Sequence, residues 1–508
     1  MLIRRKIIRD TVMLTAIQLI LDSSALLLNV FITRRLGTSA VGILSLTGTF
    51  LGLAGIISNG NAFLCTSRLI SEELGKPHSD PRRVLGYGLK LCLMLSTITS
   101  IVILVFSRRI CVRLFGNTAM LTELRLMPAA LFTGAAAGCL KGWFNAHRRS
   151  VTAAVCDIIE FTVKAAVIIG ITLTSDSISE SGVCGILITG IIAGNTVSLI
   201  CLSAVYFVTG SGSRGRCSLS FGCYVSFAVP IMAGSILTSV LGSANDALIP
   251  VCLRQYGSSL EESLSLFGIF EAIVIPTIFF PSVVLCSVSG IVVSEAARAV
   301  GAGNRERIRS FTYKLIRLTL IYSVFISAAL IRFGGVLGDM LGGGRLAGDM
   351  ITFIAPVVPF IYMEIILESL IKGMGMQAFS SMNYLAEYVI RISVVLIFVS
   401  HIGFYGIALS YYASNVIGNC SRLIKATRTA GIRFRPIRMV GVPIMYAFMT
   451  MCASELIMRL TGLPEGSAAF MTGFLLLWCT GYALIFTFFE KLSVTDKKIS
   501  TAFVKNSQ

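Results

Sequence analysis

Several ionisable side chains lie inside long apolar runs of this chain, where a charge is costly unless it has a partner or a polar cavity. Two acid–base pairs share a spacing of four residues, Glu160 with Lys164 and Glu387 with Arg391. At this spacing the two members lie on one face of a helix and can neutralise each other as structural ion pairs. The alternative is that Lys164 and Arg391 lend positive charge to a cavity that binds an anionic group.

Other polar side chains in the apolar runs have no obvious partner in the sequence. Glu364 and Glu368 lie one turn apart, and we expect no base beside them on their helix. Asp22 and Asn29 lie two turns apart and therefore share a helix face. For the asparagines the alternatives are binding and hydrogen bonds between helices, whereas for the aspartates we favour contact with a polar ligand or a cation. The candidate cavity residues are Asp22, Asn29, Arg68, Lys164, Asn245, Asp246, Glu271, Glu364, Glu368 and Arg391.

The composition indicates whether these side chains are surrounded by water or by membrane lipid. Of the 508 residues, 55% are hydrophobic and only 13% are charged, and the mean hydropathy is +0.84. Such a chain is a polytopic membrane protein, and its long apolar runs predict helices rather than a barrel. Its 14 cysteines include no CxxC pair, and no nucleotide or metal motif is present. We expect no cofactor, no metal, no disulfide framework and no catalytic residues.

Apolar runs bounded by charged and turn residues predict an all-α fold with fourteen spans. The spans cover residues 10–33, 40–66, 85–107, 121–143, 151–174, 182–209, 222–250, 264–293, 310–333, 349–372, 381–401, 403–424, 438–459 and 467–489. Most of the 43 Lys and Arg residues fall on alternate loops, which predicts that both termini are cytoplasmic. The net charge of +18 reflects this topology and an attraction to anionic membrane lipids, so it does not indicate nucleic-acid binding.

The chain also contains an internal duplication. Twelve residues separate a proline from a Lys-Gly dipeptide in two places, Pro128 to Lys141-Gly142 and Pro359 to Lys372-Gly373. A Ser-Glu dipeptide followed by arginines closes both the second and the eighth span. Repeats of six spans predict two parallel six-helix bundles with a polar site between them near the midplane. The predicted domains are an N-terminal lobe of 1–210, a C-terminal lobe of 215–430, a two-helix C-terminal hairpin of 438–490 and a cytoplasmic tail of 491–508.

Several short motifs occur in a fixed order along the chain. They are the run from Ser67 to Lys76, the two Lys-Gly turns, the segment from Asp157 to Lys164, and Phe279 to Ser282 ahead of the second Ser-Glu dipeptide. In order and spacing these motifs resemble the multidrug/oligosaccharidyl-lipid/polysaccharide exporter superfamily, and within it the polysaccharide-flippase branch that contains stage V sporulation protein B. The resemblance extends along nearly the whole chain, and fourteen spans suit this branch.

The resemblance implies a flippase in the cell membrane rather than an enzyme. Its substrate would be an undecaprenyl-linked oligosaccharide or peptidoglycan precursor, moved from the inner to the outer leaflet by alternating access. Polysaccharide or cell-wall synthesis, including sporulation, would be its setting. The partners implied are membrane lipids and a coupling cation, and the chain would act as a monomer. Two alternatives are a cation-coupled multidrug antiporter and a non-transporting membrane scaffold of a wall or sporulation complex.

Overall fold

The structure is a computed structural model, and it describes residues 2–74, 80–112, 121–147, 149–174, 180–209, 219–461 and 470–487. The regular elements of these residues are all helices. In the first half they are α1 (Leu2–Leu36), α2 (Thr38–Asn59), α3 (Ala62–Leu74), α4 (Pro81–Ile110), α5 (Leu121–Leu124), α6 (Met127–Ala146), α7 (Ser150–Thr174), α8 (Glu180–Thr209) and α9 (Phe221–Tyr256).

The second half begins with α10 (Leu260–Ile269), the π-helix η2 (Phe270–Val274), α11 (Ile275–Phe279), η3 (Phe280–Ser282), α12 (Val283–Gly301), α13 (Arg305–Met340) and α14 (Gly344–Ile354). It continues with η4 (Ala355–Val357), α15 (Val358–Gly373), α16 (Gln377–Val394), the π-helix η5 (Val395–Val399), α17 (Ser400–Ile402), α18 (Phe404–Ala430), η6 (Ile437–Gly441) and α19 (Val442–Leu460). A last helix, Phe470–Thr487, follows. The predicted tail of 491–508 lies outside the described residues.

The predicted all-α membrane fold is confirmed. Within the described residues, 11 helices or continuous helical runs are long and apolar enough to cross a membrane. The other three predicted spans fall on α6, α7 and α18, which are helical over 20, 25 and 27 residues. In α7 the side chains of Asp157, Glu160 and Lys164 interrupt the apolar surface, so this helix needs polar neighbours within the membrane.

The chain forms two compact units. Unit 1 comprises Met1–Ser287, Gly334–Ile351 and Ser381–Gly418, and unit 2 comprises Val288–Phe333, Thr352–Ser380 and Asn419–Gln508. The lobes and the terminal hairpin inferred from the sequence follow the internal duplication, whereas the two compact units follow the contacts within the fold. That division stays a prediction.

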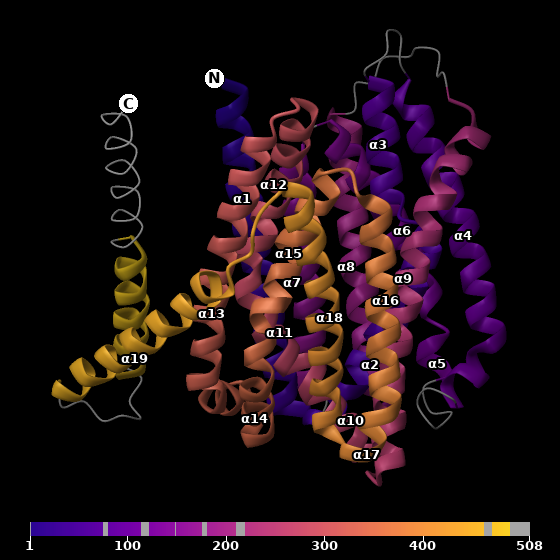
Figure 1. Cartoon of the computed structure of the whole chain (residues 1–508). Helices are drawn as coiled ribbons and strands as arrows, with labels where there is room; N and C mark the ends of the chain where they lie inside the picture. Colours follow the sequence, from indigo (N-terminus) through magenta and orange to yellow (C-terminus); the bar gives the residue numbers. More distant parts are fainter. Residues whose placement is uncertain are drawn as a thin grey trace. The chain divides into compact units, whose positions relative to one another are not determined.

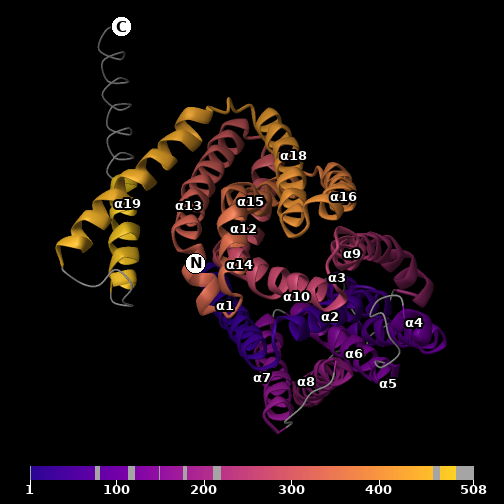
Figure 2. The ribbon, with the colours of Figure 1, turned by 90° about the horizontal axis from the view of Figure 1, so that it is seen from below.

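In unit 1, α2 is a central helix that contacts α4, α6, α9 and α10 (Figure 2). Its contact with α10 is unusually close. A Cβ atom added at Gly42 would lie 1.8 Å from the carbonyl oxygen of Leu264, and one added at Gly268 would lie 2.4 Å from that of Thr38. Because the obstructing atoms belong to the backbone, only glycine permits the two helices to meet here.

The last two described helices, drawn in yellow in Figure 1, belong to unit 2 and pack against α13. Aromatic side chains make this contact. Trp478 is fully buried, and its indole N–H donates a hydrogen bond to the Ala447 carbonyl at 2.9 Å. The hydroxyl of Tyr482 donates to the Ile321 carbonyl at 2.9 Å. The rings bury a large apolar area while their polar atoms remain hydrogen-bonded, which makes them effective anchors inside a membrane protein.

The two Lys-Gly turns pack in the same manner. A Cβ atom on Gly142, near the end of α6, would lie 2.8 Å from the carbonyl oxygen of Phe63 on α3. One on Gly373, at the end of α15, would lie 2.6 Å from that of Val293 on α12. Both α3 and α12 carry a Ser-Glu dipeptide toward their end. The equivalent glycines therefore pack on equivalent helices, in agreement with the duplication inferred from the sequence.

Candidate functional site

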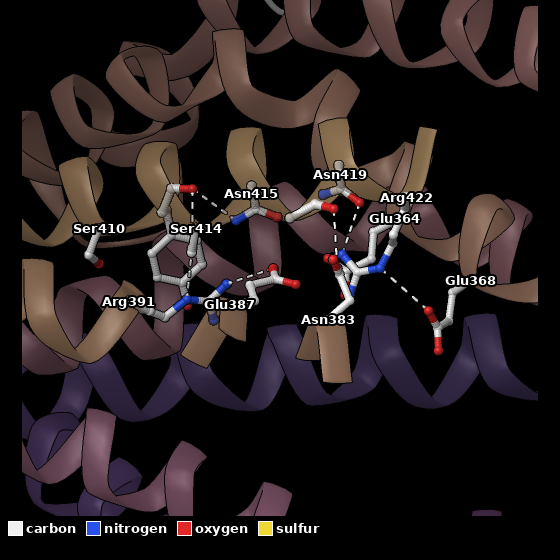
Figure 3. A network of polar contacts seen from close by, with 12 residues as sticks. Glu364, Glu368, Asn383, Glu387, Arg391, Ser410, Ser414, Asn415, Asn419 and Arg422 are labelled. Atoms are coloured by element: carbon white, nitrogen blue, oxygen red, sulfur yellow. Dashed lines mark hydrogen bonds and ion pairs between the residues drawn. The ribbon is translucent and has the colours of Figure 1, made fainter. Parts of the chain in front are cut away.

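Arg391, on α16 in unit 1, lies among polar groups from two helices. Its guanidinium is 3.7 Å from the carboxylate of Glu387, one turn earlier on α16, and its side chain is only 16% exposed. Its Nε donates to the hydroxyl of Ser414 on α18 at 3.0 Å. The guanidinium also lies over the ring of Tyr411, 4.5 Å from the ring centroid. Figure 3 shows the Arg391 side chain between Glu387 and Ser414.

Two acids on other helices of unit 1 interact electrostatically with Arg391. Asp246 on α9 accepts hydrogen bonds from the Thr49 hydroxyl at 3.3 Å and from the Asn245 amide at 3.2 Å, and its charge interacts with that of Arg391. Glu271 interacts with both Asp246 and Arg391. It lies in η2, and a π-turn re-aims helix side chains and often marks a functional site. The Arg391 cluster is defined as Asp246, Glu271, Glu387, Arg391 and Tyr411.

Aromatic rings connect the helices of this cluster. The ring of Tyr411 on α18 stands 5.4 Å from that of Phe270, the residue before Glu271, in an edge-to-face arrangement. The ring of Tyr388 on α16 lies 5.6 Å from the Arg391 guanidinium. A Cβ atom at Gly242 of α9 would lie 3.5 Å from the Tyr388 hydroxyl, so α9 passes close to that ring. The result is a charged and hydroxyl-rich site built by α9, η2, α16 and α18.

A second ionic cluster lies in unit 2 around Arg422 of α18. This side chain is 0% exposed, and its guanidinium lies 3.6 Å from Glu364 and 3.4 Å from Glu368, both on α15. It also donates to the Asn419 side chain at 3.1 Å (Figure 3). Two acids and one base thus share a buried position, which ties α18 to α15.

The expectation that Glu364 and Glu368 have no base beside them is therefore wrong. Lys372 follows Glu368 by one turn on α15, and its ammonium lies 3.1 Å from that carboxylate. The hydroxyl of Ser380 also donates to Glu368. The sequence places Arg422 near the end of an apolar run, but α18 continues to Ala430. Arg422 therefore lies inside the helix, facing α15, rather than in a loop.

The expected ion pair between Glu160 and Lys164 also differs from the structure. Glu160 lies 2.8 Å from the ammonium of Lys141 on α6, which is also 2.6 Å from Asp157. The ammonium of Lys164 lies near the ring of Phe161, 6.0 Å from its centroid. Because α6 and α7 are neighbours, the ammonium of Lys141 on the adjacent helix comes within 2.8 Å of both carboxylates.

Lys141 is expected to stabilise the α6–α7 contact more than Lys164 does. Lys141→Met leaves Asp157 and Glu160 without their base, so it should lower the free energy of unfolding by about 1.5–3 kcal/mol, the range for hydrogen bonds to charged groups. Lys164→Met, the matched control on α7, should change it by well under half as much. Thermal melting of the purified variants in detergent measures both, and a larger loss for Lys164→Met would contradict the assignment.

Three further predicted cavity residues make other contacts. Asp22 accepts a hydrogen bond from Gln18 of its own helix at 2.9 Å. Asn29 donates to the Ala272 carbonyl at 3.2 Å, a hydrogen bond between α1 and η2. Arg68 is 61% exposed and lies 3.2 Å from Glu72. Their role in binding stays a prediction.

Sequence reasoning did not select several partners of these charged side chains, some of them on other helices and some on the same helix. They are Thr49, Lys141, Lys372, Tyr388, Tyr411, Ser414, Asn419 and Arg422. A usable signal existed on α18, where polar residues recur at positions 415, 419 and 422. Spacings of four and three place them on one helix face, which is the pattern of a polar stripe inside a bundle.

The described helices are long and apolar enough to cross a membrane and hold charged side chains inside the fold, so the chain belongs to the class of multi-pass membrane proteins. Such charges are retained where a polar solute or ion must be accommodated. The comparisons with known proteins agree with this class.

Three solved structures illustrate the shared fold. The lipid II flippase MurJ in an inward closed conformation is 12% identical, with a TM-score of 0.71, over 95% of this chain and 100% of that chain. An inward-facing multidrug resistance MATE family transporter of the MOP superfamily is 14% identical, with a TM-score of 0.64, over 81% and 94%. The MATE multidrug transporter DinF-BH is 18% identical, with a TM-score of 0.59, over 83% and 95%. Protein-family models and curated protein sequences give no match.

These likenesses confirm, at the level of the fold, the resemblance inferred from the sequence motifs. MATE transporters and MurJ both have the fold of this chain. The fold does not by itself choose between a lipid-linked substrate and a drug.

Proposed function

We propose that this protein is a flippase that moves a lipid-linked oligosaccharide or peptidoglycan precursor from the inner to the outer leaflet by alternating access. The Arg391 cluster carries this proposal, because it is a charged site within apolar membrane helices. The likeness to the lipid II flippase over 95% of the chain adds support, compared with 81% for the inward-facing MATE transporter.

The polar headgroup is the part of a lipid-linked sugar that the membrane excludes. A sugar pyrophosphate cannot cross roughly 30 Å of hydrocarbon unless polar groups replace the water that it loses. We place Asp246, Glu271 and Arg391 on the path of the headgroup, where hydrogen bonds and charges perform this replacement. The undecaprenyl tail remains among the membrane lipids. No covalent bond is made or broken, so this function requires neither a cofactor nor catalytic residues.

The proposal includes the setting of the protein. We place it in the cell membrane as a monomer. Both termini are placed in the cytoplasm, because most Lys and Arg residues fall on alternate loops. With such a substrate, the protein would serve polysaccharide or peptidoglycan synthesis, including synthesis during sporulation.

Asp246→Asn is expected to slow headgroup translocation about tenfold, since the loss of one hydrogen bond or charge contact of about 1.5–3 kcal/mol corresponds to at least that factor. The measurement uses the purified chain in vesicles with a fluorescent undecaprenyl-pyrophosphate sugar, whose outward movement exposes it to a membrane-impermeant quencher. Asp349→Asn is the matched control, because Asp349 is exposed on α14 next to Arg345. Equal rates for the two variants would remove Asp246 from the path.

The same vesicles test the second candidate function. The fold is shared with MATE multidrug transporters, so an antiporter of organic cations is the alternative. An antiporter would drive a cationic dye across the membrane against an ion gradient and leave the lipid-linked sugar in place. A scaffold would do neither. Sugar translocation without dye transport is the result that the flippase proposal requires.

A further inference from the structure

The Arg391 cluster contains three acids and one base. In apolar surroundings each carboxylate must be neutralised by a proton, by a cation from solution or by a basic side chain. Here the guanidinium of Arg391 lies 3.7 Å from Glu387 and interacts electrostatically with Asp246 and Glu271. Arg391 supplies one positive charge, so the chain itself neutralises one of the three carboxylates at a position where a transporter would otherwise take a cation from outside.

The surroundings of Arg391 fit a guanidinium in particular. Its Nε donates to Ser414 at 3.0 Å, and its plane lies near the rings of Tyr411 and Tyr388, at 4.5 and 5.6 Å from their centroids. A planar cation with several donors can use an acceptor hydroxyl, carboxylates and aromatic faces at the same time.

The acids are also not arranged as metal ligands. Oxygen ligands of a bound metal ion converge on a single point. In the described part of the chain, no group of three or more His, Cys, Asp or Glu side chains could hold a metal ion. The carboxylates of the Arg391 cluster come from three separate elements, α9, η2 and α16.

We infer that Arg391 is a resident cation. Its fixed positive charge replaces the coupling cation that an ion-driven exporter binds from solution. Headgroup translocation then runs without a sodium or potassium gradient. This inference rests on the proposed flippase function and specifies its ion requirement.

The first test uses the unaltered protein in the vesicle assay. Sodium and potassium are replaced on both sides by N-methylglucamine, a cation too large for a side-chain-sized site. We expect the translocation rate to stay within about twofold, whereas a coupled cation typically changes affinity by about 5- to 150-fold. A drop of about fivefold or more that sodium or potassium reverses would overturn the inference.

The second test replaces the resident cation. Arg391→Ala should slow translocation, and millimolar guanidinium chloride should restore it, because the small ion can occupy the space of the lost side chain. Urea has the same shape without the charge and should not restore it, nor should sodium chloride. Arg391→Lys, which keeps the charge, should translocate the headgroup without sodium. Rescue by sodium, equal effects of urea and guanidinium, or failure of both guanidinium and lysine would each overturn the assignment.

Failure of the flippase proposal remains distinguishable from failure of this inference. If the unaltered protein moves no lipid-linked sugar under any ionic condition, the flippase proposal is wrong. The resident-cation assignment is then tested by thermal melting, in which low guanidinium concentrations should raise the melting temperature of Arg391→Ala and not that of the unaltered protein. Absence of that difference would reject the assignment too.

Discussion

Arg422→Met is expected to lower the free energy of unfolding by about 3–5 kcal/mol, the cost of removing one partner from a buried ion pair. The guanidinium is 0% exposed and lies 3.6 Å from Glu364 and 3.4 Å from Glu368. Glu368 keeps Lys372 as a partner, but Glu364 would lose its contact with the guanidinium, and its side chain is only 18% exposed. Thermal melting in detergent measures the loss.

Two further variants make this prediction specific. Arg428→Met removes a charge of the same type from the same helix at an exposed position, so its melting temperature should stay close to that of the unaltered protein. Adding Glu364→Gln to Arg422→Met should recover part of the loss, because it removes the unpaired charge. Equal melting of the two methionine variants would contradict the role assigned to Arg422.

Gly42→Ala is the second change with a large expected effect. The new methyl group would lie 1.8 Å from the Leu264 carbonyl oxygen, so α2 and α10 must separate along their contact. Overpacking of a rigid core costs about 1–3 kcal/mol, and the obstruction here is backbone, which indicates the upper part of that range. Detergent melting temperature and helix content by circular dichroism are the measurements.

The control for Gly42 lies on the same helix. A Cβ atom at Gly52 would meet no atom within 4 Å. Gly52→Ala should therefore stabilise the protein slightly, by about 0.5–1 kcal/mol, because alanine favours the helix. A loss for Gly52→Ala as large as that for Gly42→Ala would show that the effect is general to glycines of α2 and independent of the contact with α10.

The sequence was sufficient to predict the fold class. Hydropathy identifies the segments that lie in lipid, and in lipid a helix satisfies the hydrogen bonds of its own backbone. It was also sufficient to place Asp246, Glu271 and Arg391 among the candidates, since charges inside apolar runs stand out. The spacing of Glu387 and Arg391 describes one helix face, and the two side chains do lie 3.7 Å apart.

The sequence did not reveal partners on neighbouring helices. The rule for residues four apart compares positions of one helix, so it paired Glu160 with Lys164. In the structure Glu160 forms an ion pair with Lys141 of the neighbouring helix. It also left Glu364 without the Arg422 of α18. Helix boundaries contributed to the second error, because an apolar run can end before the helix does. Tertiary packing decides which charges meet, and a single sequence does not show which helices pack against one another.

The aromatic anchor of the C-terminal helices has a practical consequence. The chain has 2 tryptophans, and each is buried in a different unit: Trp143 in the core of unit 1 and Trp478 against α13 in unit 2. Variants that keep only one of them carry a single tryptophan, whose emission, excited apart from that of the 14 tyrosines, reports the melting of one unit at a time. The protein therefore allows the cooperativity between its two parts to be followed optically without an added label.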